Sequence, residues 1–200
     1  MQKAIFNIQN ETDFERCALQ VFKHQFENNK VYRSFCDLLY IHPSDVKEVA
    51  QIPFLPIQFF KTHQVLSTNQ SVQETFTSSG TTGAQVSKHL VADVSWYEAS
   101  YTRAFEHFYG PIEDYTVLGL LPNYLEREGS SLIYMVNDFI HKSNNPKSGF
   151  YLDNLSELTK TLIALDQKGE KVLLIGVTFA LLDLIESQTF TLKNTVIMET

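Results

Sequence analysis

The most constraining feature of the sequence is an alternation of strand-like and helix-like segments after about residue 110. Short, almost wholly apolar runs occupy residues 115–121, 171–177 and 195–198, and such runs are typical of strands buried on both faces. Helix-like segments separate them. This order predicts an α/β fold with a mostly parallel sheet flanked by helices, in which ligands bind at the carboxyl ends of the strands.

Start and stop signals set the bounds of the helices in this region. Asp93 and Ser130 are placed to cap two helices, and Gly110 and Gly169 follow two helix ends. The expected helices cover residues 93–109, 130–142, 156–168 and 179–187. The first has an aromatic face that is expected to be core, made of Trp96, Tyr97, Tyr101, Phe105, Phe108 and Tyr109.

The N-terminal part of the chain has a different pattern. Apolar residues recur at helical spacing from Phe14 to Phe26 and predict an amphipathic helix capped by Thr12 or Asp13. A second helix is expected over residues 30–40 and a third after Ser44. These segments together predict a helical beginning to the chain.

Two prolines divide the apolar stretch at residues 52–60, which favours a buried crossing segment over a central strand. We therefore expect a domain boundary near residue 65. Residues 1–65 would form a helical prefix packed on the sheet, and residues 66–200 would form an α/β region.

Composition narrows the classes of function. With 44% hydrophobic and 20% charged residues the chain is typical of a globular protein. A net charge of −7, with the basic residues scattered, opposes binding to nucleic acid or anionic lipid. No run reaches the roughly 18 apolar residues of a membrane span, and no signal segment is recognisable, so a cytoplasmic location is expected. The two cysteines, Cys17 and Cys36, are too few for a disulfide framework or a metal site.

A Ser/Thr/Gly-rich segment at residues 77–83 carries the strongest chemical signal. It holds five hydroxyl side chains and two glycines, and a β-like run at residues 88–91 follows it. Phosphate requires many donors at short range, and glycines let backbone amides approach its oxygens. A surface hairpin rich in turn formers has a similar composition, so composition alone leaves both interpretations open.

The string itself resembles the phosphate-binding signature of the adenylate-forming superfamily, which includes the acyl-CoA synthetases. Together with residues 52–63 and 124–135, it is similar to the acyl-protein synthetase (LuxE-like) branch, related to phenylacetate-CoA ligases. The resemblance implies the N-terminal region of an adenylate-forming enzyme, with ATP and Mg²⁺ as cofactors. It implies phosphate binding by Thr77, Ser78, Ser79, Gly80, Thr81, Thr82 and Gly83.

The resemblance also implies a reaction. An AMP-forming acyl ligase of this type joins a carboxylate to ATP, giving an acyl-adenylate, and then transfers the acyl group to a thiol. The substrate would be a carboxylic acid such as a fatty acid, and the acceptor a thiol on a protein or on CoA. Reductase or acyltransferase proteins would be partners. No catalytic residue and no protein metal ligand is assigned.

Two departures from the family pattern concern single residues. Lys88 lies two positions later than the lysine of related ligases, and we count it among the cofactor-binding candidates. LuxE-like proteins carry the acyl group on a cysteine of their carboxyl half, whereas Cys17 and Cys36 lie in the helical prefix. Neither is expected to be the acceptor, and Cys17 is expected to be an inert core thiol.

The loop after the strand at residues 115–121 borders the acyl group in related ligases. This implies Tyr124, Ser130 and Ser131 as substrate-lining residues, although a helix cap is an alternative role for Ser130. The family continues past the position of Thr200, so we expect this chain to be an incomplete, inactive portion of the enzyme. A non-catalytic module that binds acyl groups, nucleotide or a partner protein is the alternative function.

Overall fold

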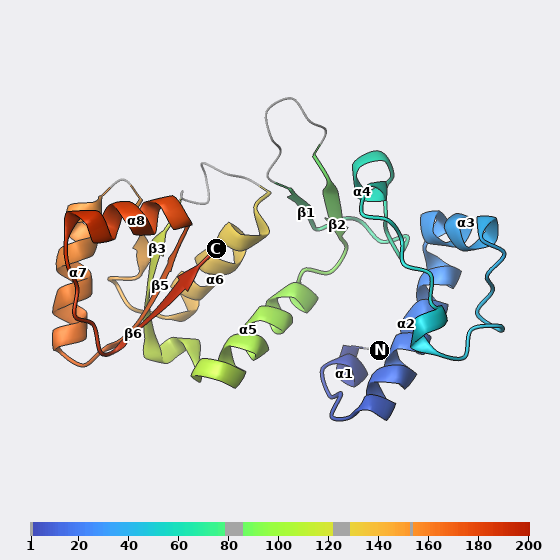
Figure 1. The fold of residues 1–200 in the computed structure, drawn as a ribbon, viewed down its shortest axis with the longest axis horizontal. Helices are drawn as coiled ribbons and strands as arrows, with labels where there is room; N and C mark the ends of the chain where they lie inside the picture. The colour runs from blue at the N-terminus through green and yellow to red at the C-terminus, as the bar shows by residue number, and fades with distance from the viewer. Residues whose placement is uncertain (1, 79–85, 122–128, 153) are drawn as a thin grey trace. The chain divides into compact units, whose positions relative to one another are not determined.

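The structure is a computed structural model that describes residues 2–78, 86–121, 129–152 and 154–200. The chain divides into two compact units, residues 1–100 and residues 101–200. Figure 1 shows their elements along the chain. The parallel sheet and the helical N-terminal part confirm the predicted fold class. A domain boundary near residue 65, and packing of residues 1–65 on the sheet, stay predictions.

The first unit begins with three helices, α1 (Gln2–Ile5), α2 (Glu11–Asn28) and α3 (Lys30–Leu38). Helices α2 and α3 share a small core with one residue of the segment that follows them. This core contains Phe22, Phe26, Tyr32, Cys36 and Val46. The spacing of the apolar residues therefore identified both helices correctly.

The start of α2 differs from the prediction. The Asn10 side chain accepts a hydrogen bond from the backbone amide of Asp13 at 2.9 Å, so Asn10 is the cap and the expected caps Thr12 and Asp13 are wrong. Asparagine caps a helix as well as aspartate does. Starting the helix at Glu11 also places Glu11 and Asp13 in the first turn, where carboxylates favour the helix dipole.

The predicted helix after Ser44 does not form. Its place is taken by a single 3₁₀ turn, η1 (Val49–Gln51). The Gln51 side chain accepts hydrogen bonds from the backbone amides of Lys47 at 2.8 Å and Glu48 at 3.2 Å. These contacts satisfy amides at the start of a tight turn, so the segment does not need a longer helix.

The expected buried crossing at residues 52–60 is wrong in part. Ile52 and Leu55 pack against the core shared by α2 and α3, but Phe54 is 76% exposed and Ile57 is 70% exposed. The two prolines hold much of this segment extended, so alternate side chains point in opposite directions. A short helix, α4 (Phe59–Thr62), ends it.

An antiparallel hairpin completes the first unit. Strand β1 (Glu74–Thr77) pairs with β2 (Lys88–Val91), and the Phe76 ring lies 5.2 Å from that of Tyr97. Helix α5 (Ser95–Tyr109) follows and continues into the second unit. The Asp93 carboxylate accepts from the backbone amide of Ser95 at 3.1 Å. The first helical hydrogen bond runs from the Glu98 amide to the Val94 carbonyl, so the cap expected at Asp93 is one residue early.

The second unit is built on a parallel sheet of four strands in the order β4-β3-β5-β6. The strands are β3 (Tyr115–Leu120), β4 (Gly149–Phe150), β5 (Lys171–Gly176) and β6 (Thr195–Glu199), and a 3₁₀ turn, η2 (Ile112–Asp114), precedes the first of them. All three strands expected from the apolar runs are confirmed. The last of them, expected to be central, is instead an edge strand of the described sheet, and its Ile197 is 55% exposed.

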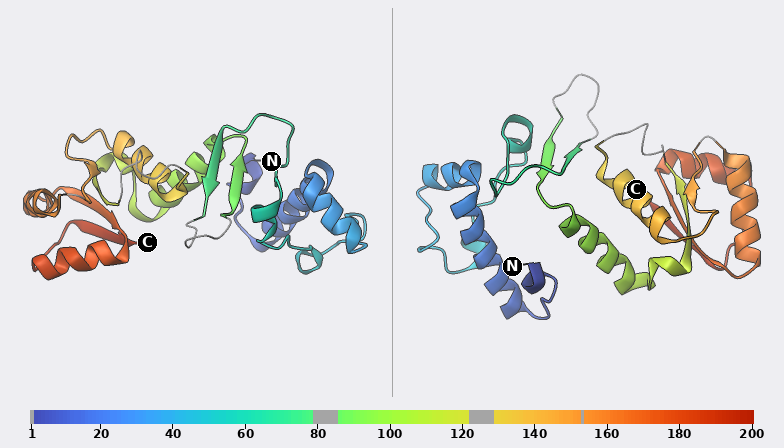
Figure 2. Two further views of the ribbon diagram at one scale, coloured as in Figure 1. Left: turned by 90° about the horizontal axis from the view of Figure 1, so that it is seen from above. Right: turned by 180° about the vertical axis from the view of Figure 1, so that it is seen from behind.

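Helices cover both faces of this sheet (Figure 2). Helices α7 (Leu155–Gln167) and α8 (Thr178–Ser187) pack on one face, against Leu118, Leu120 and Leu174. Helix α6 (Ser131–Lys142) covers the other face, where Val136 lies close to Gly119. The predicted helices are thus confirmed to within a few residues at their ends.

The aromatic face of α5 is core only in part. Tyr101 and Phe105 are buried, and their rings each lie 5.3 Å from that of Phe139 on α6. Phe108, near the end of the helix, is exposed. Tyr109 is also exposed. The prediction that this whole face is core is therefore wrong at Phe108 and Tyr109, because α6 covers only part of α5.

Candidate functional site

The hairpin of the first unit brings three of the predicted phosphate-binding residues together. Thr77 is paired directly with Lys88, so their side chains share one face of the hairpin. The Ser78 amide donates to the carbonyl of Ser87 at 3.1 Å, and the Ser87 amide donates to the Ser78 hydroxyl at 3.1 Å. Two hydroxyls and an ammonium therefore lie at the base of the connecting loop. Ser79, Gly80, Thr81, Thr82 and Gly83 lie outside the described residues.

This donor set fits the phosphates of ATP. Hydroxyls donate to phosphate oxygens, and a lysine ammonium adds a charge-assisted donor. Because Lys88 is paired with Thr77, its position two residues later in the sequence still places it beside the loop. Among the residues that the structure describes, no group of three or more His, Cys, Asp or Glu side chains could hold a metal ion.

The carboxyl edge of the sheet in the second unit is the other expected ligand position. The connection after β3 runs through α6 on one face, and the connection after β5 runs through α8 on the opposite face. Strand order thus reverses between β3 and β5, which is where open α/β sheets bind ligands.

Two of the three predicted lining residues lie at the start of α6. The Ser130 hydroxyl accepts from the amide of Ile133 at 3.4 Å, so Ser130 is the cap of α6. Ser131 is the first residue of that helix, and Tyr124 lies outside the described residues. The structure also places the Thr178 hydroxyl against the Glu199 carboxylate, where it donates a short hydrogen bond. Sequence reasoning missed this pair, although Glu199 ends β6 and Thr178 lies two residues after the end of β5.

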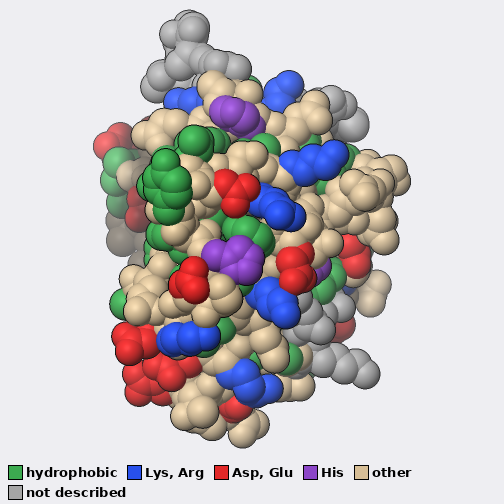
Figure 3. Space-filling model, turned by 90° about the vertical axis from the view of Figure 1, so that its right-hand side faces the viewer, with side chains coloured by type: hydrophobic (Ala, Val, Ile, Leu, Met, Phe, Trp, Pro, Cys, Tyr) green, Lys and Arg blue, Asp and Glu red, His purple; other side chains and the backbone are tan. Residues whose placement is uncertain are grey.

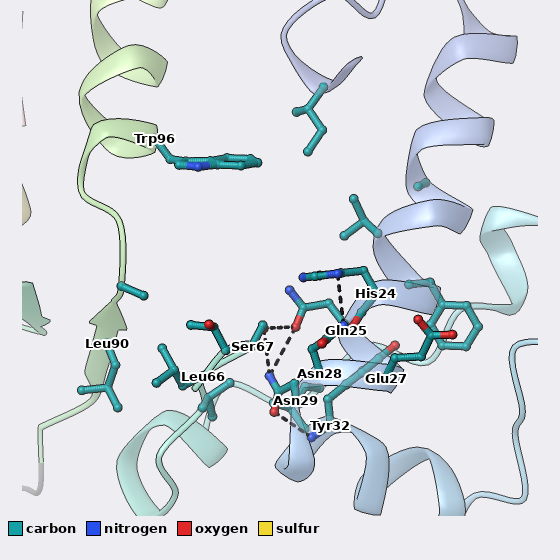
Figure 4. A pocket seen from close by; sticks show the side chains of 18 of the residues that line it. His24, Gln25, Glu27, Asn28, Asn29, Tyr32, Leu66, Ser67, Leu90 and Trp96 are labelled. Carbon is teal, nitrogen blue, oxygen red and sulfur yellow. Dashed lines mark hydrogen bonds between the residues drawn. The ribbon is translucent and has the colours of Figure 1, made fainter. Parts of the chain in front are cut away.

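A large cavity in the first unit was also missed. It has a volume of about 1540 Å³, and its apolar wall includes Phe14, Ala18 and Val21 of α2. Residues from later segments, Leu66, Leu90 and Trp96, line it as well. Figure 4 shows Trp96, Leu66 and Leu90 across the cavity from α2. No local sequence pattern signals such a cavity, because its walls come from segments far apart in the chain.

Polar side chains gather at one end of this cavity (Figure 4). The Asn29 amide group donates to Gln25 at 3.3 Å, and the Ser67 hydroxyl also donates to Gln25. The Asn29 carbonyl oxygen accepts from the backbone amide of Tyr32 at 3.1 Å, and the Tyr32 hydroxyl donates to the carbonyl of Pro53 at 2.6 Å. Burial raises the pKa of Tyr32, so its hydroxyl stays a neutral donor.

The outer face of the first unit mixes charges of both signs (Figure 3). Helix α2 pairs Lys23 with Glu27 at 3.9 Å, and helix α3 pairs Arg33 with Asp37 at 3.9 Å. Exposed pairs of this kind contribute little to stability. They intersperse basic and acidic side chains along both helices.

The fold and the hairpin together define an α/β protein with hydroxyl and lysine donors suited to phosphate. The sequence profile described as "Acyl-protein synthetase, LuxE" matches residues 4–112, just over half of the chain. The chain therefore belongs to the LuxE acyl-protein synthetase family, as the resemblance predicted. The matched segment contains the hairpin and every residue of the cavity wall.

Among curated proteins, the chain is similar to a long-chain-fatty-acid–luciferin-component ligase of Photorhabdus luminescens. The two are 30% identical over 70 residues, which are 34% of this chain and 60% of the relative. The chain therefore spans about 60% of the length of that relative. No solved structure matches. Within the described residues, no helix is both long enough and apolar enough to cross a membrane.

Proposed function

We propose that the protein is an ATP-dependent, AMP-forming acyl ligase that activates a long-chain carboxylic acid. The observation that carries the proposal is the family match over residues 4–112. This segment includes the hairpin and the string that resembles a phosphate-binding signature. The name of the Photorhabdus relative, a long-chain-fatty-acid ligase, supports the same class of substrate.

The reaction has two steps in this proposal. A carboxylate oxygen attacks the α-phosphorus of ATP, so a new O–P bond forms and pyrophosphate leaves. A thiolate then attacks the acyl carbon, so a thioester forms and AMP leaves. The thiol belongs to a protein or to CoA, and reductase or acyltransferase proteins are the proposed partners. A cytoplasmic location is part of the same proposal.

The hairpin would supply binding and electrostatic stabilisation rather than a nucleophile. Thr77, Ser78 and Lys88 would donate to the phosphate oxygens from the base of the loop. Ser79, Gly80, Thr81, Thr82 and Gly83 would complete this binding from the loop. Mg²⁺ bound with ATP would offset further phosphate charge.

The carboxyl edge of the second unit would contact the substrate. Tyr124, Ser130 and Ser131 are proposed as lining residues because their segment follows β3 at the point where strand order reverses. The Ser130 hydroxyl already caps α6, so its contribution would be to hold the start of that helix.

The test is carboxylate-dependent exchange between ATP and pyrophosphate, measured with the full-length natural protein. We expect Thr81→Val and Lys88→Gln each to lower the exchange rate about 100-fold or more, because each removes a donor to charge that develops in the reaction. Lys23→Gln is the matched control, because Lys23 is an exposed lysine of α2 outside the cavity. An exchange rate equal to that of the wild-type protein in both Thr81→Val and Lys88→Gln would contradict the proposal.

Calorimetric titration of the same protein with ATP distinguishes the proposed ligase from the alternative, a non-catalytic module. ATP that binds with measurable heat, without exchange for any carboxylic acid, would indicate a non-catalytic nucleotide-binding module. Absence of both heat and exchange would indicate a partner-interaction module.

A further inference from the structure

We propose that the cavity of the first unit binds the alkyl chain of a long-chain carboxylic acid, with the carboxylate end toward the base of the hairpin. This inference deepens the proposed function and rests on it, because it assigns the acid to a place in the structure. It takes the place of the lining proposed at Tyr124, Ser130 and Ser131 of the second unit, which would then not contact the alkyl chain.

The first step of the argument is the character of the walls. Three apolar residues of α2, Phe14, Ala18 and Val21, line the cavity. Phe14 is 50% exposed although it is a large aromatic residue. Exposed apolar surface of this kind is unfavourable in water unless something covers it. The cavity thus offers a ready apolar surface for an alkyl chain.

The second step is size. Pockets for small ligands usually have volumes of roughly 300–1000 Å³. This cavity, at about 1540 Å³, exceeds that range. A long flexible chain uses such a volume better than a compact ring system does.

The third step is charge. The charged residues around the cavity include Lys30, but also Glu27 and Asp93. This mixture does not attract an anion as a whole, so affinity must come from burying methylene groups. Each added methylene should tighten binding by about fourfold until the cavity is full, since burial of one contributes about 0.8 kcal/mol.

The fourth step is the direction of the hairpin. Strand residues two apart point to the same face, so Lys88 and Leu90 share a face of β2. Thr77 pairs with Lys88 and lies on that face too, and Leu90 lines the cavity together with its strand neighbours His89 and Val91. The distance along the strand from Lys88 to Leu90 is about 7 Å. An acid whose chain contacts Leu90 can therefore reach the phosphate-binding hairpin with its carboxylate.

The protein carries its own reporter for this cavity. Trp96 lines the wall and is the single tryptophan of the chain. Bromine atoms quench tryptophan fluorescence on contact. We expect dibromo-octadecanoic acid, added below its micelle concentration and without ATP, to quench Trp96 saturably. Unlabelled hexadecanoic acid should reverse the quenching, and hexanoic acid should compete far more weakly.

Two variants locate the binding site. Val21→Asp places a charge in the apolar wall and should weaken binding at least tenfold. Gln20→Asp is the matched control, because Gln20 is an exposed neighbour on the same helix outside the cavity. Leu90→Phe keeps the wall apolar but narrows it, so it should shift the preference toward shorter acids even if Val21→Asp folds poorly.

The outcomes are distinct. Saturable quenching that Val21→Asp abolishes and Gln20→Asp retains supports the inference. Absent quenching, or quenching unchanged in Val21→Asp and Leu90→Phe, overturns it. Self-association that protects Trp96 and disappears in Val21→Asp also overturns it, since a second copy would then occupy the cavity.

Failure of the inference is separable from failure of the proposed function. If Leu90→Phe still catalyses exchange between ATP and pyrophosphate and prefers acids of the same chain length as the wild-type protein, the inference alone is overturned. Binding of the acid without exchange in the wild-type protein would overturn the proposed function alone.

Discussion

The two units of the molecule use their apolar residues differently. Every residue of β3 in the second unit is buried, and helices close both faces of its sheet. The two strands of the first unit contain one buried residue, Phe76, and this unit has a large cavity instead. Since burial of apolar surface is the main source of stability, we expect the buried sheet to contribute most of the stability of the second unit. The first unit leaves apolar side chains along the wall of its cavity.

The largest expected effect comes from opening a cavity in the second unit. Leu162 of α7 is fully buried against β3 and β5. Leu162→Ala should lower the free energy of unfolding by about 2–5 kcal/mol. Denaturant unfolding followed by far-UV circular dichroism measures this change. Leu182→Ala on α8 is the control, because Leu182 is half exposed and should cost far less.

The same experiment sharpens the comparison between the units. Trp96 belongs to the first unit, so its fluorescence follows that unit during unfolding. If the units unfold separately, Leu162→Ala leaves the Trp96 transition in place. A Trp96 transition that moves together with the circular dichroism would show that the two units unfold as one.

A smaller effect is expected from filling space in the sheet. A Cβ atom added at Gly176 would lie 2.8 Å from Cγ of Leu181 and 3.2 Å from Cβ of Leu120. Gly176→Ala should therefore destabilise the protein by about 1–3 kcal/mol. Gly149→Ala is the control, since its nearest atom would be Cε2 of Tyr151 at 3.8 Å. Equal stability of the two variants would contradict the close packing at Gly176.

In the first unit, a single hydrogen bond should have a measurable but modest effect. The Tyr32 hydroxyl donates to the carbonyl of Pro53 and ties α3 to the extended segment. Tyr32→Phe should destabilise the first unit by about 1 kcal/mol. The Trp96 fluorescence transition detects it. Tyr40→Phe, at a side chain that is 95% exposed, should have no effect.

The smallest effect is confined to acid conditions. The Asp166 carboxylate at the end of α7 accepts from the amides of Asn194 at 2.7 Å and Lys193 at 2.9 Å. These bonds, with the Thr195 hydroxyl, hold the pKa of Asp166 below its usual value. A lowered folded-state pKa means that the stabilisation is complete above the ordinary aspartate pKa and is lost as pH falls through the lowered one.

Unfolding measured in steps of acid pH tests this carboxylate. Asp166→Asn should remove part of the loss of stability seen in the wild-type protein below about pH 4. Asp183→Asn, at an exposed position of α8, is the control. An unchanged acid dependence in Asp166→Asn would show that other carboxylates account for it.

Local signals predicted most elements of the fold. The apolar runs at 115–121, 171–177 and 195–198 became strands because a strand buried on both faces must be apolar throughout. Ser130 was predictable as a cap because capping involves only neighbouring residues. The helix expected after Ser44 failed for the same local reason, since the Gln51 side chain favours a tighter turn.

The candidate site was predictable only where it consists of consecutive residues. The string from Thr77 to Gly83 could be compared with a known family directly. The pairing of Thr77 with Lys88, and the wall shared by Val21, Leu90 and Trp96, depend on which segments meet in space.

The sequence by itself determined the fold class, three of the four strands of the parallel sheet, most helices and the membership of the LuxE family, because periodicity, caps and motifs are properties of neighbouring residues. The tertiary structure alone decided that β6 is an edge strand, that Phe54 is exposed and that the first unit surrounds a cavity. Those features follow from the packing of distant segments. The energy of such packing depends on shape and burial, which no short stretch of sequence specifies.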